Sequence, residues 1–512
     1  MATAELPHGD SAGTFLGHPK GLFVLFFAEM WERFSYYGMR ALLIFYLTKH
    51  WLFDDSQAGV IYGAYTALVY ITPVLGGYLA DKYLGQRKAV TYGAVLLTFG
   101  HLLMGFEGNG GQDAASLNIF WLALAFIIVG SGFLKANISV IVGQLYPRTD
   151  VRRDGAYTIF YMGINLGAAL GSLLCGYLGE TYGWSYGFGA AGVGMLLGLV
   201  VFVLFKPLLL GRGEPPAILT KGREWGLYVV GLAAVVACWW MVQNQSVVGT
   251  LLGLAGAILV AYVLFTAVVK LEPHDRDRIF AAMFLILGSI LFWALFEQAG
   301  SSLNLYTDRH VDRGGVPASV FQSINAIYIV LLAPLFAGLW TWLGRRGLEP
   351  SAPAKFGLAL MQLGAGFLVL VAGAATGDMT PVLFIFLIYL LHTTGELCLS
   401  PVGLSAMNRL APAHMASIIM GTWFFASATG NFVAGLIAAA TGSEAASGEG
   451  AGKEVVLGVY SQIGWIAIAV GVGVLVVSPL IKKLMHLDTL ADDTSVAEGV
   501  DEAYPVAARP AE

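Results

Sequence analysis

The chain contains fourteen apolar blocks of about 20 residues, separated by short polar loops. A block of that length crosses the hydrocarbon core of a bilayer as one α-helix, the only open-chain structure that satisfies its own backbone there. Charged residues make up 12% of the chain, against about 25% in soluble proteins. We therefore predict an all-α polytopic membrane protein with helices near 20–48, 57–81, 87–106, 118–143, 155–178, 185–205, 224–243, 247–270, 277–301, 317–342, 355–373, 381–403, 413–440 and 456–484.

Lys and Arg concentrate in alternate loops of this arrangement. With the N-terminus in the cytoplasm, the basic residues in outer loops are only Lys49, Arg309, Arg313 and Lys453. The positive-inside rule then predicts that both termini are cytoplasmic. No cleavable signal is expected before the first block, and the acidic segment from Leu487 onward is expected to be disordered.

The two ends of the chain share a weak internal repeat. TPVLGG and APLFAG align at Pro73 and Pro334, and Lys135 and Glu396 recur at the same spacing. Two parallel six-helix halves around a midplane site have this signature. The predicted organisation is a cytoplasmic N-terminal tail (1–19), an N-terminal six-helix bundle (20–205), a linker with two extra transmembrane helices (206–276), a C-terminal six-helix bundle (277–484) and a disordered cytoplasmic tail (485–512).

The first apolar block contains AEMWERFSYYGMR, which places Glu29, Glu32, Arg33 and Arg40 inside one span. At about 100° per residue, Glu29, Arg33 and Arg40 share one face of the helix, and Glu32 flanks them. Each charge at the bilayer centre costs about 2.5–3.5 kcal/mol. A purely structural span would not contain four, so we interpret this helix as functional.

Three further charged residues lie inside spans: Lys135, Glu297 and Glu396, and His101 and His392 could join them. Four acids then face three bases. Neutrality in a poorly solvated cavity requires one carboxylate to be protonated, or a bound cation, which favours proton coupling. The alternative is a static set of ion pairs that holds helices together, and the excess acid argues against it.

The charges are also distributed unequally between the halves. Two acids face three bases in the N-terminal half, whereas Glu297 and Glu396 make the C-terminal half acidic. A cavity between them would have a cationic and an anionic wall, which suits a zwitterion better than an anion or a sugar.

Neutral side chains complete the candidate site. Hydroxyls and amides that could bind a peptide bond are offered by Tyr36, Tyr37, Tyr70, Asn165 and Asn325. Trp293, Phe296 and Trp423 could line apolar pockets. Each of these residues by itself is more often a packing residue, but a buried amide needs partners in a lipid-surrounded bundle, which favours Asn165 and Asn325.

Several segments resemble one family in its expected order. AEMWERFSYYG resembles the ExxER signature of the proton-dependent oligopeptide transporters, and GGYLADKYLGQRK resembles their form of the major facilitator loop motif. GFLKANIS, FYMGINLGA, FWALFEQ, FQSINAIYI, TTGELCLSPVG and MGTWFFASATGN are also similar to family segments. The resemblance covers roughly residues 15 to 485. It implies a major facilitator fold with two extra helices and proton-driven uptake of di- and tripeptides.

The resemblance also implies roles for individual residues. Glu29, Glu32 and Arg33 resemble the proton-coupling triad, and Glu297 resembles an acid linked to proton binding and to an outer gate with Arg40. Arg40 and Lys135 would meet the peptide carboxylate and Glu396 the amino terminus, while a Lys135–Glu396 pair would close the inner side. Arg33 is also counted among the substrate-binding residues. The remaining matches to pocket positions are Tyr36, Tyr37, Tyr70, Asn165, Trp293, Asn325, Trp423 and Ser427.

The sequence departs from the family in two places. The histidine that some members have on the second helix is missing between Gln57 and Leu84, so proton coupling would depend on the carboxylates. Phe296 stands where several bacterial relatives have a polar residue, which would alter side-chain preference. His392 lies one turn before Glu396, and packing is the favoured interpretation of it.

The leading hypothesis is a proton-coupled peptide symporter, with a carrier of nitrate or another small metabolite as the alternative. A membrane hydrolase is disfavoured because no HExxH motif and no serine with a matching histidine and acid occur in the spans. We expect no enzyme activity, metal, cofactor or nucleic acid, and no disulfide among Cys175, Cys238 and Cys398. The expected partners are a small peptide, the proton and the lipid bilayer, and the expected form is a monomer in the bacterial inner membrane.

Overall fold

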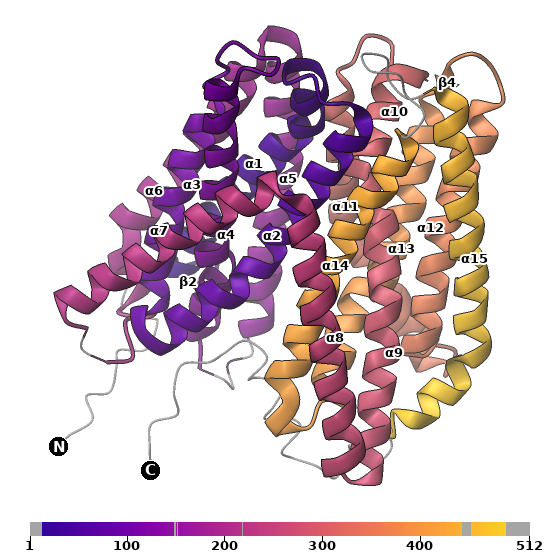
Figure 1. Cartoon of the computed structure of the whole chain (residues 1–512). Coiled ribbons are helices and arrows are strands. Elements are labelled where there is room, and N and C mark those ends of the chain that lie inside the picture. The colour runs from indigo at the N-terminus through magenta and orange to yellow at the C-terminus, as the bar shows by residue number, and fades with distance from the viewer. Residues whose placement is uncertain (1–12, 148–149, 151, 218, 443–451, 488–512) are drawn as a thin grey trace.

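The computed structural model describes residues 13–147, 150, 152–217, 219–442 and 452–487. Within them the chain is almost entirely helical, and the long helices form two groups that stand side by side (Figure 1). The strands found in this part of the chain form two short pairs. β1 (Thr14–Phe15) is antiparallel to β2 (His18–Pro19), and β3 (Val311–Asp312) is parallel to β4 (Thr380–Pro381).

The first group contains six long helices, in which α1 packs against α5 and α6, and α4 packs against α2 and α3. Their bounds are α1 (Lys20–Phe45), α2 (Asp55–Leu79), α3 (Gln86–Met104), α4 (Ala114–Gln144), α5 (Arg153–Tyr182) and α6 (Trp184–Phe205). Short π or 3-10 turns extend three of them, namely η2 (Tyr46–His50), η3 (Ala80–Leu84) and η4 (Lys206–Leu209). We call this group the first half.

Two helices connect the groups: α7 (Lys221–Gln243) and α8 (Gln245–Lys270). α7 packs against α4 of the first half, and α8 packs against α9 of the second group. The Tyr92 hydroxyl on α3 donates to the Tyr228 carbonyl on α7 at 2.7 Å, and Lys88 forms an ion pair with Glu224 at 2.8 Å. These contacts attach α7 to the first half.

The second half begins at α9. Its helices and turns are α9 (Pro273–Phe296), η5 (Glu297–Gly300), α10 (Ser302–His310), η6 (Ala318–Gln322), α11 (Ser323–Arg345), α12 (Ala352–Ala374), α13 (Leu383–Leu410), η7 (Ala413–Met415), α14 (Ala416–Thr441) and α15 (Lys453–Leu484). α12 packs against α13 and α15, and α14 packs against both α9 and α2. The end of the molecule with α10 and β4, uppermost in Figure 1, is called the α10 end below.

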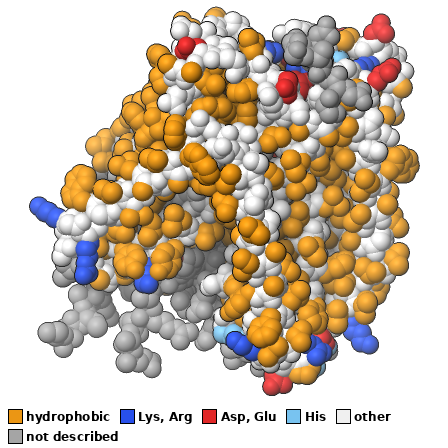
Figure 2. Space-filling model, in the orientation of Figure 1, with side chains coloured by type: hydrophobic (Ala, Val, Ile, Leu, Met, Phe, Trp, Pro, Cys, Tyr) orange, Lys and Arg blue, Asp and Glu red, His pale blue; other side chains and the backbone are white. Residues whose placement is uncertain are grey.

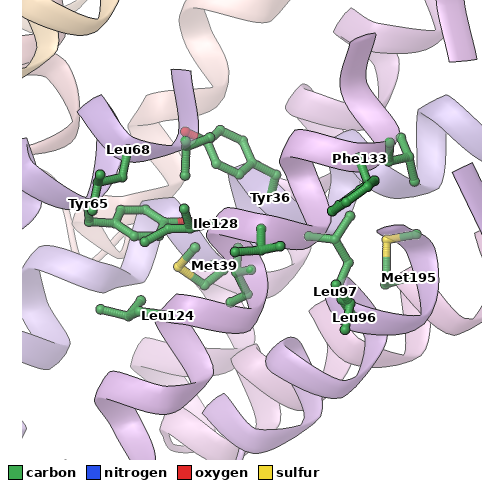
Figure 3. Close-up of a cluster of buried hydrophobic side chains, with 14 of the residues drawn as sticks. Tyr36, Met39, Tyr65, Leu68, Leu96, Leu97, Leu124, Ile128, Phe133 and Met195 are labelled. Carbon is green, nitrogen blue, oxygen red and sulfur yellow. The ribbon is translucent and has the colours of Figure 1, made fainter. Parts of the chain in front are cut away.

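Each half has its own hydrophobic core. The larger cluster lies mainly in α1–α4 and includes Phe45 and Trp51, whereas the second lies in α9–α15 and includes Phe292, Phe356 and Phe367. Figure 3 shows part of the first cluster, with Tyr36 and Tyr65 among aliphatic side chains. Two separate cores are what two helix bundles require.

The outer surface suits a lipid environment. Figure 2 shows hydrophobic side chains over the flank of the molecule and charged ones mainly toward its two ends. Ile258 and Phe265 on α8 are 70% and 59% exposed. Among the described residues, twelve helical segments are long and apolar enough to cross a membrane. α1 and α3 are not among these twelve segments, although both are helices of the first half. The predicted all-α membrane fold is confirmed.

Two local predictions were wrong. The helix expected over 381–403 continues to Leu410, because the helix extends past the end of the apolar run into a segment that contains Ser405 and Arg409. α10 was not predicted at all. Its sequence SLNLYTDRH has no apolar block, and it is buried by contacts with distant segments.

The predicted domain boundaries are not tested by these observations and stay predictions. α6 ends at Phe205 and α9 begins at Pro273, near the expected limits of the linker. Most of each predicted tail, 1–12 and 488–512, lies outside the described residues. Of the N-terminal tail, residues 14–19 form the β1–β2 hairpin, which Arg152 contacts by donating to the Gly17 carbonyl at 3.0 Å.

Candidate substrate and proton site

Arg33 holds two acids together inside α1. Its guanidinium contacts Glu29 at 2.7 Å and Glu32 at 3.0 Å, and all three side chains are buried. A second oxygen of Glu29 and both oxygens of Glu32 have no hydrogen-bond partner in the structure. One guanidinium therefore faces two carboxylates, so this cluster has an acid in excess.

Lys135 on α4 lies beside this cluster and faces aromatic rings. Its ammonium is 4.2 Å from the centroid of the Tyr70 ring and 5.8 Å from that of Tyr36. The face of an aromatic ring attracts a cation, which stabilises the buried ammonium. Tyr36 is only 1% exposed and packs into the core of the first half (Figure 3).

Arg40 connects the two halves. Its guanidinium forms a buried ion pair with Glu297 in η5 and donates to the Tyr62 hydroxyl on α2 at 2.5 Å. A Cβ at Gly300 would collide with that hydroxyl, so glycine is required for the close approach of η5 to the first half. The predicted neighbours Arg40 and Glu297 are thus in direct contact.

Glu396 on α13 has its own partner in the second half. The Asn325 amide donates to the Glu396 carboxylate and to the Thr393 hydroxyl, both at 3.0 Å. The expected Lys135–Glu396 ion pair is absent among the described residues, because Lys135 faces Tyr70 and Glu396 accepts from Asn325. Closure of the inner side by this pair stays a prediction.

Tyr37 lies where the two halves meet. It packs against Ala168 and Ala169 on α5 and against Ala326 on α11. Arg40 lies beside it, with its guanidinium carbon 5.7 Å from the centroid of the Tyr37 ring. Tyr37 is therefore close to the Arg40–Glu297 pair that joins the two halves.

The remaining candidate pocket residues differ in their contacts. Asn165 donates to the Tyr161 carbonyl at 3.1 Å, and Ser427 donates to the Trp423 carbonyl at 3.4 Å. Trp423 packs on Phe356 inside the second half, which is a core position. Trp293 packs on Phe296, and its indole nitrogen has no partner.

The two histidines differ in their surroundings. His392 contacts the Leu363 carbonyl at 3.2 Å, and its ring packs on Phe367, so it has a structural environment. His101 is 1% exposed, and neither ring nitrogen has a partner. Cys175, Cys238 and Cys398 are free and buried. In the described residues, no group of His, Cys, Asp or Glu is placed to hold a metal ion.

Several contacts between the halves at the α10 end were not predicted from the sequence. Arg309 on α10 binds Asp55 on α2 through two hydrogen bonds of 2.5 and 2.9 Å. The Glu180 carboxylate on α5 accepts from the backbone of Ser319 at 2.7 Å, at the start of η6. An acid that accepts from the backbone at a helix N-terminus is a recognisable pattern when both are close in the sequence. Here Glu180 and Ser319 are 139 residues apart, so the sequence around η6 does not show which acid caps it.

A family model described as the POT family matches residues 87–455. Three curated relatives align over most of the chain. The uncharacterised transporter YclF of Bacillus subtilis is 38% identical over 492 residues, covering 92% of this chain and 96% of that protein. The peptide transporter YePEPT of Yersinia enterocolitica is 39% identical, covering 83% and 88%, and dipeptide and tripeptide permease B of Shigella dysenteriae is 30% identical, covering 92% and 97%.

Solved structures agree with this assignment. A peptide transporter POT in complex with sulfate superposes with a TM-score of 0.80 at 36% identity, covering 92% of this chain and 97% of that one. A POT family transporter in complex with 5-aminolevulinic acid gives 0.78 at 32% identity, covering 91% and 98%. The fold is therefore of the major facilitator type, and the chain belongs to the POT family, whose members are transporters and not enzymes.

Proposed function

We propose that this protein is a proton-coupled symporter that imports di- and tripeptides. Relatives whose names state peptide transport support this substrate class. The observation that carries the proposal is the unequal placement of charged residues, with Arg33, Arg40 and Lys135 on helices of the first half and Glu297 and Glu396 in η5 and α13 of the second half. A peptide has an amino and a carboxylate end, and such a site offers each end the opposite sign.

In the proposed pose, the peptide carboxylate lies near Arg33 and Lys135, and the amino terminus lies near Glu396. Asn325 already donates to Glu396, so it would orient the carboxylate toward an incoming ammonium group. Tyr36, Tyr37, Tyr70, Asn165, Trp293, Trp423 and Ser427 keep their proposed roles as pocket residues. The packed positions of Tyr36 and Trp423 give these two the weakest support.

The proton would be held by the acids that Arg33 and Arg40 contact. Glu29, Glu32 and Glu297 are buried. Together with Glu396 they make four acids, which could carry one charge more than the three bases Arg33, Arg40 and Lys135 supply. A proton on one of them restores the balance. Protonation of Glu297 would also weaken its ion pair with Arg40 and release the α10 end. The membrane potential drives each inward net charge by about 2.3 kcal/mol per 100 mV.

The membrane arrangement is part of the proposal. The Lys and Arg distribution supports an inner-membrane protein with both termini in the cytoplasm, which makes the α10 end the outer end. Each half contributes residues to a site within one chain, which supports the monomer as the transporting unit. One similar solved structure, at 26% identity, is described as tetrameric, and assembly of that kind would not alter the site.

Uptake of labelled dialanine into proteoliposomes tests the proposal. An inward proton gradient is expected to accelerate uptake and to accumulate peptide above equilibrium, and excess unlabelled dialanine is expected to compete. Liposomes with Glu396→Gln protein are the matched control for specific binding. Failure of the gradient to stimulate uptake would overturn proton coupling. Competition by nitrate, but not by dipeptides, would support the metabolite-carrier alternative.

A further inference from the structure

The turn η5 has two faces with different partners. Glu297 and Gly300 face the first half, where Glu297 pairs with Arg40, and a Cβ on Gly300 would lie 3.1 Å from the Arg40 Nε. Gln298 points into the second half and is completely buried. The position of Glu297 therefore depends on what holds Gln298.

The Gln298 side chain spans the break between α9 and η5. Its amide nitrogen donates to the carbonyls of Ala294 on α9 and Ala434 on α14, both at 3.0 Å. The carbonyls of the last turn of a helix lack helical partners, so the first bond satisfies a group that the end of α9 leaves open. The second bond fastens the turn to α14.

Two hydroxyls continue this contact to α15. The Ser302 hydroxyl at the start of α10 donates to the Gln298 side-chain oxygen at 2.5 Å, and it lies 2.7 Å from the Tyr460 hydroxyl on α15. The three side chains are at most 3% exposed. The chain of hydrogen bonds thus joins α15, α10, η5 and α14.

The donors and acceptors in this chain allow one direction only. Both hydrogens of the Gln298 amide nitrogen are donated to the two carbonyls, and its oxygen can only accept. The single hydroxyl hydrogen of Ser302 is therefore donated to the Gln298 oxygen. Tyr460 must then donate to Ser302. A buried network with every member satisfied fixes one geometry, and loss of one donor leaves an unpaired group.

The anchor on α14 is also close to the second contact between the halves. Gly435 follows Ala434, and a Cβ at Gly63 on α2 would lie 2.6 Å from the Gly435 Cα. The network therefore links the Arg40–Glu297 pair to the crossing of α2 and α14. Both contacts hold the α10 end closed.

We propose that Gln298, Ser302 and Tyr460 are positioning residues that hold η5 so that Glu297 reaches Arg40 and the α10 end stays closed. This inference rests on the proposed alternating-access transport, but it concerns the gate and not the substrate. The chemistry on both sides of the gate stays intact when Tyr460 loses its hydroxyl. Only the placement of Glu297 would change.

The test measures the α10 end directly. Spin labels at Asn109→Cys and Met379→Cys, on loops of opposite halves, report its opening by pulsed electron paramagnetic resonance in nanodiscs without peptide or gradient. Tyr460→Phe and Ser302→Ala are each expected to raise the ratio of open to closed molecules about fivefold, the effect of one lost hydrogen bond. Tyr92→Phe is the matched control, because it removes a 2.7 Å bond to the Tyr228 carbonyl, between α3 and α7 and outside the network.

A double-mutant cycle separates positioning from general weakening of the fold. In a Glu297→Gln background, Tyr460→Phe is expected to add no further opening, because the pair it positions is already lost. The proposal is overturned by equal opening in Tyr92→Phe, by an undiminished effect of Tyr460→Phe in the Glu297→Gln background, or by no opening in either network variant. Ser302→Ala decides the case if Tyr460→Phe does not fold. Dialanine uptake is measured separately, because it tests the proposed transport function. A failure of uptake would leave the spin-label distances, and therefore the test of this inference, unchanged.

Discussion

Arg40 on α1 and Glu297 in η5 are 257 residues apart in the sequence and form a buried ion pair between the two halves. Both side chains are buried, so loss of either one leaves the other charge without its partner. Removing one member of a buried pair costs about 3–5 kcal/mol. In the proposed mechanism this pair holds the α10 end closed, and a proton on Glu297 releases it.

Glu297→Gln is expected to abolish proton-driven accumulation while peptide counterflow partly survives, because the α10 end no longer responds to protons. Asp308→Asn is the control, since Asp308 forms ion pairs with the partly exposed Lys49 and Arg313, and surface pairs are worth about 0–1 kcal/mol. Uptake with and without a gradient, and counterflow at equal pH, distinguish the two. Full accumulation by Glu297→Gln would remove it from the coupling mechanism.

Arg33→Lys is expected to abolish proton-driven uptake while retaining part of the counterflow. The planar guanidinium contacts Glu29 and Glu32 at once, and a lysine ammonium is a point charge that cannot reproduce this fork. Glu29→Gln is expected to behave in the same way. Normal gradient-driven accumulation in either variant would show that this cluster is structural.

Glu396→Gln is expected to weaken competition by ordinary dipeptides about tenfold or more, because an amide offers no charge to the peptide amino group. Peptides with a blocked amino terminus are expected to compete as they do with the unmodified protein. Competition assays with matched free and acetylated dipeptides measure the difference. An equal loss for both peptides would mean that Glu396 acts on the fold or on another part of the substrate.

Gly63→Ala is expected to destabilise the closed α10 end by about 1–3 kcal/mol, the usual cost of overpacking. The added methyl would press on the Gly435 backbone, where α2 and α14 cross. Gly77→Ala on the same helix is the control, since its Cβ would make an ordinary 3.7 Å contact with Ala136. Thermal unfolding and the spin-label distances described above compare the two. Equal behaviour would contradict the close crossing.

The β1–β2 hairpin is expected to stay attached over pH 5–8. Hydrogen bonds from Arg152 lower the pKa of Asp150, so the carboxylate stays charged and orients the arginine that binds the Gly17 carbonyl. A lowered acid pKa stabilises the attachment above the ordinary aspartate value of about 3.9, and this stabilisation is lost as the pH falls below it. Hydrogen exchange of residues 14–19, corrected for intrinsic rates, is expected to rise only in that range. Asp150→Asn is expected to raise it at neutral pH.

The sequence by itself determined the features that depend on neighbouring residues. Runs of apolar side chains defined most helices to within a few residues, and four charges in one span marked α1 as the candidate functional helix, because charges are costly to bury. Its role in proton coupling stays a prediction. The motifs around Glu29, Lys135 and Glu396 also identified the family. Where polar sequence was buried by distant contacts, as in α10, these local signals failed.

Only the tertiary structure decided which groups meet. In it Arg40 forms an ion pair with Glu297, the Asn325 amide donates to Glu396, and the Lys135 ammonium lies over the Tyr70 ring. It also joined Gln298, Ser302 and Tyr460 into one network, although Tyr460 lies 158 residues from Ser302 in the sequence. Hydrogen bonds and ion pairs act over a few ångströms and depend on direction, so the packing of helices decides which groups become partners. The spacing of residues along one helix contains no information about how that helix packs against another.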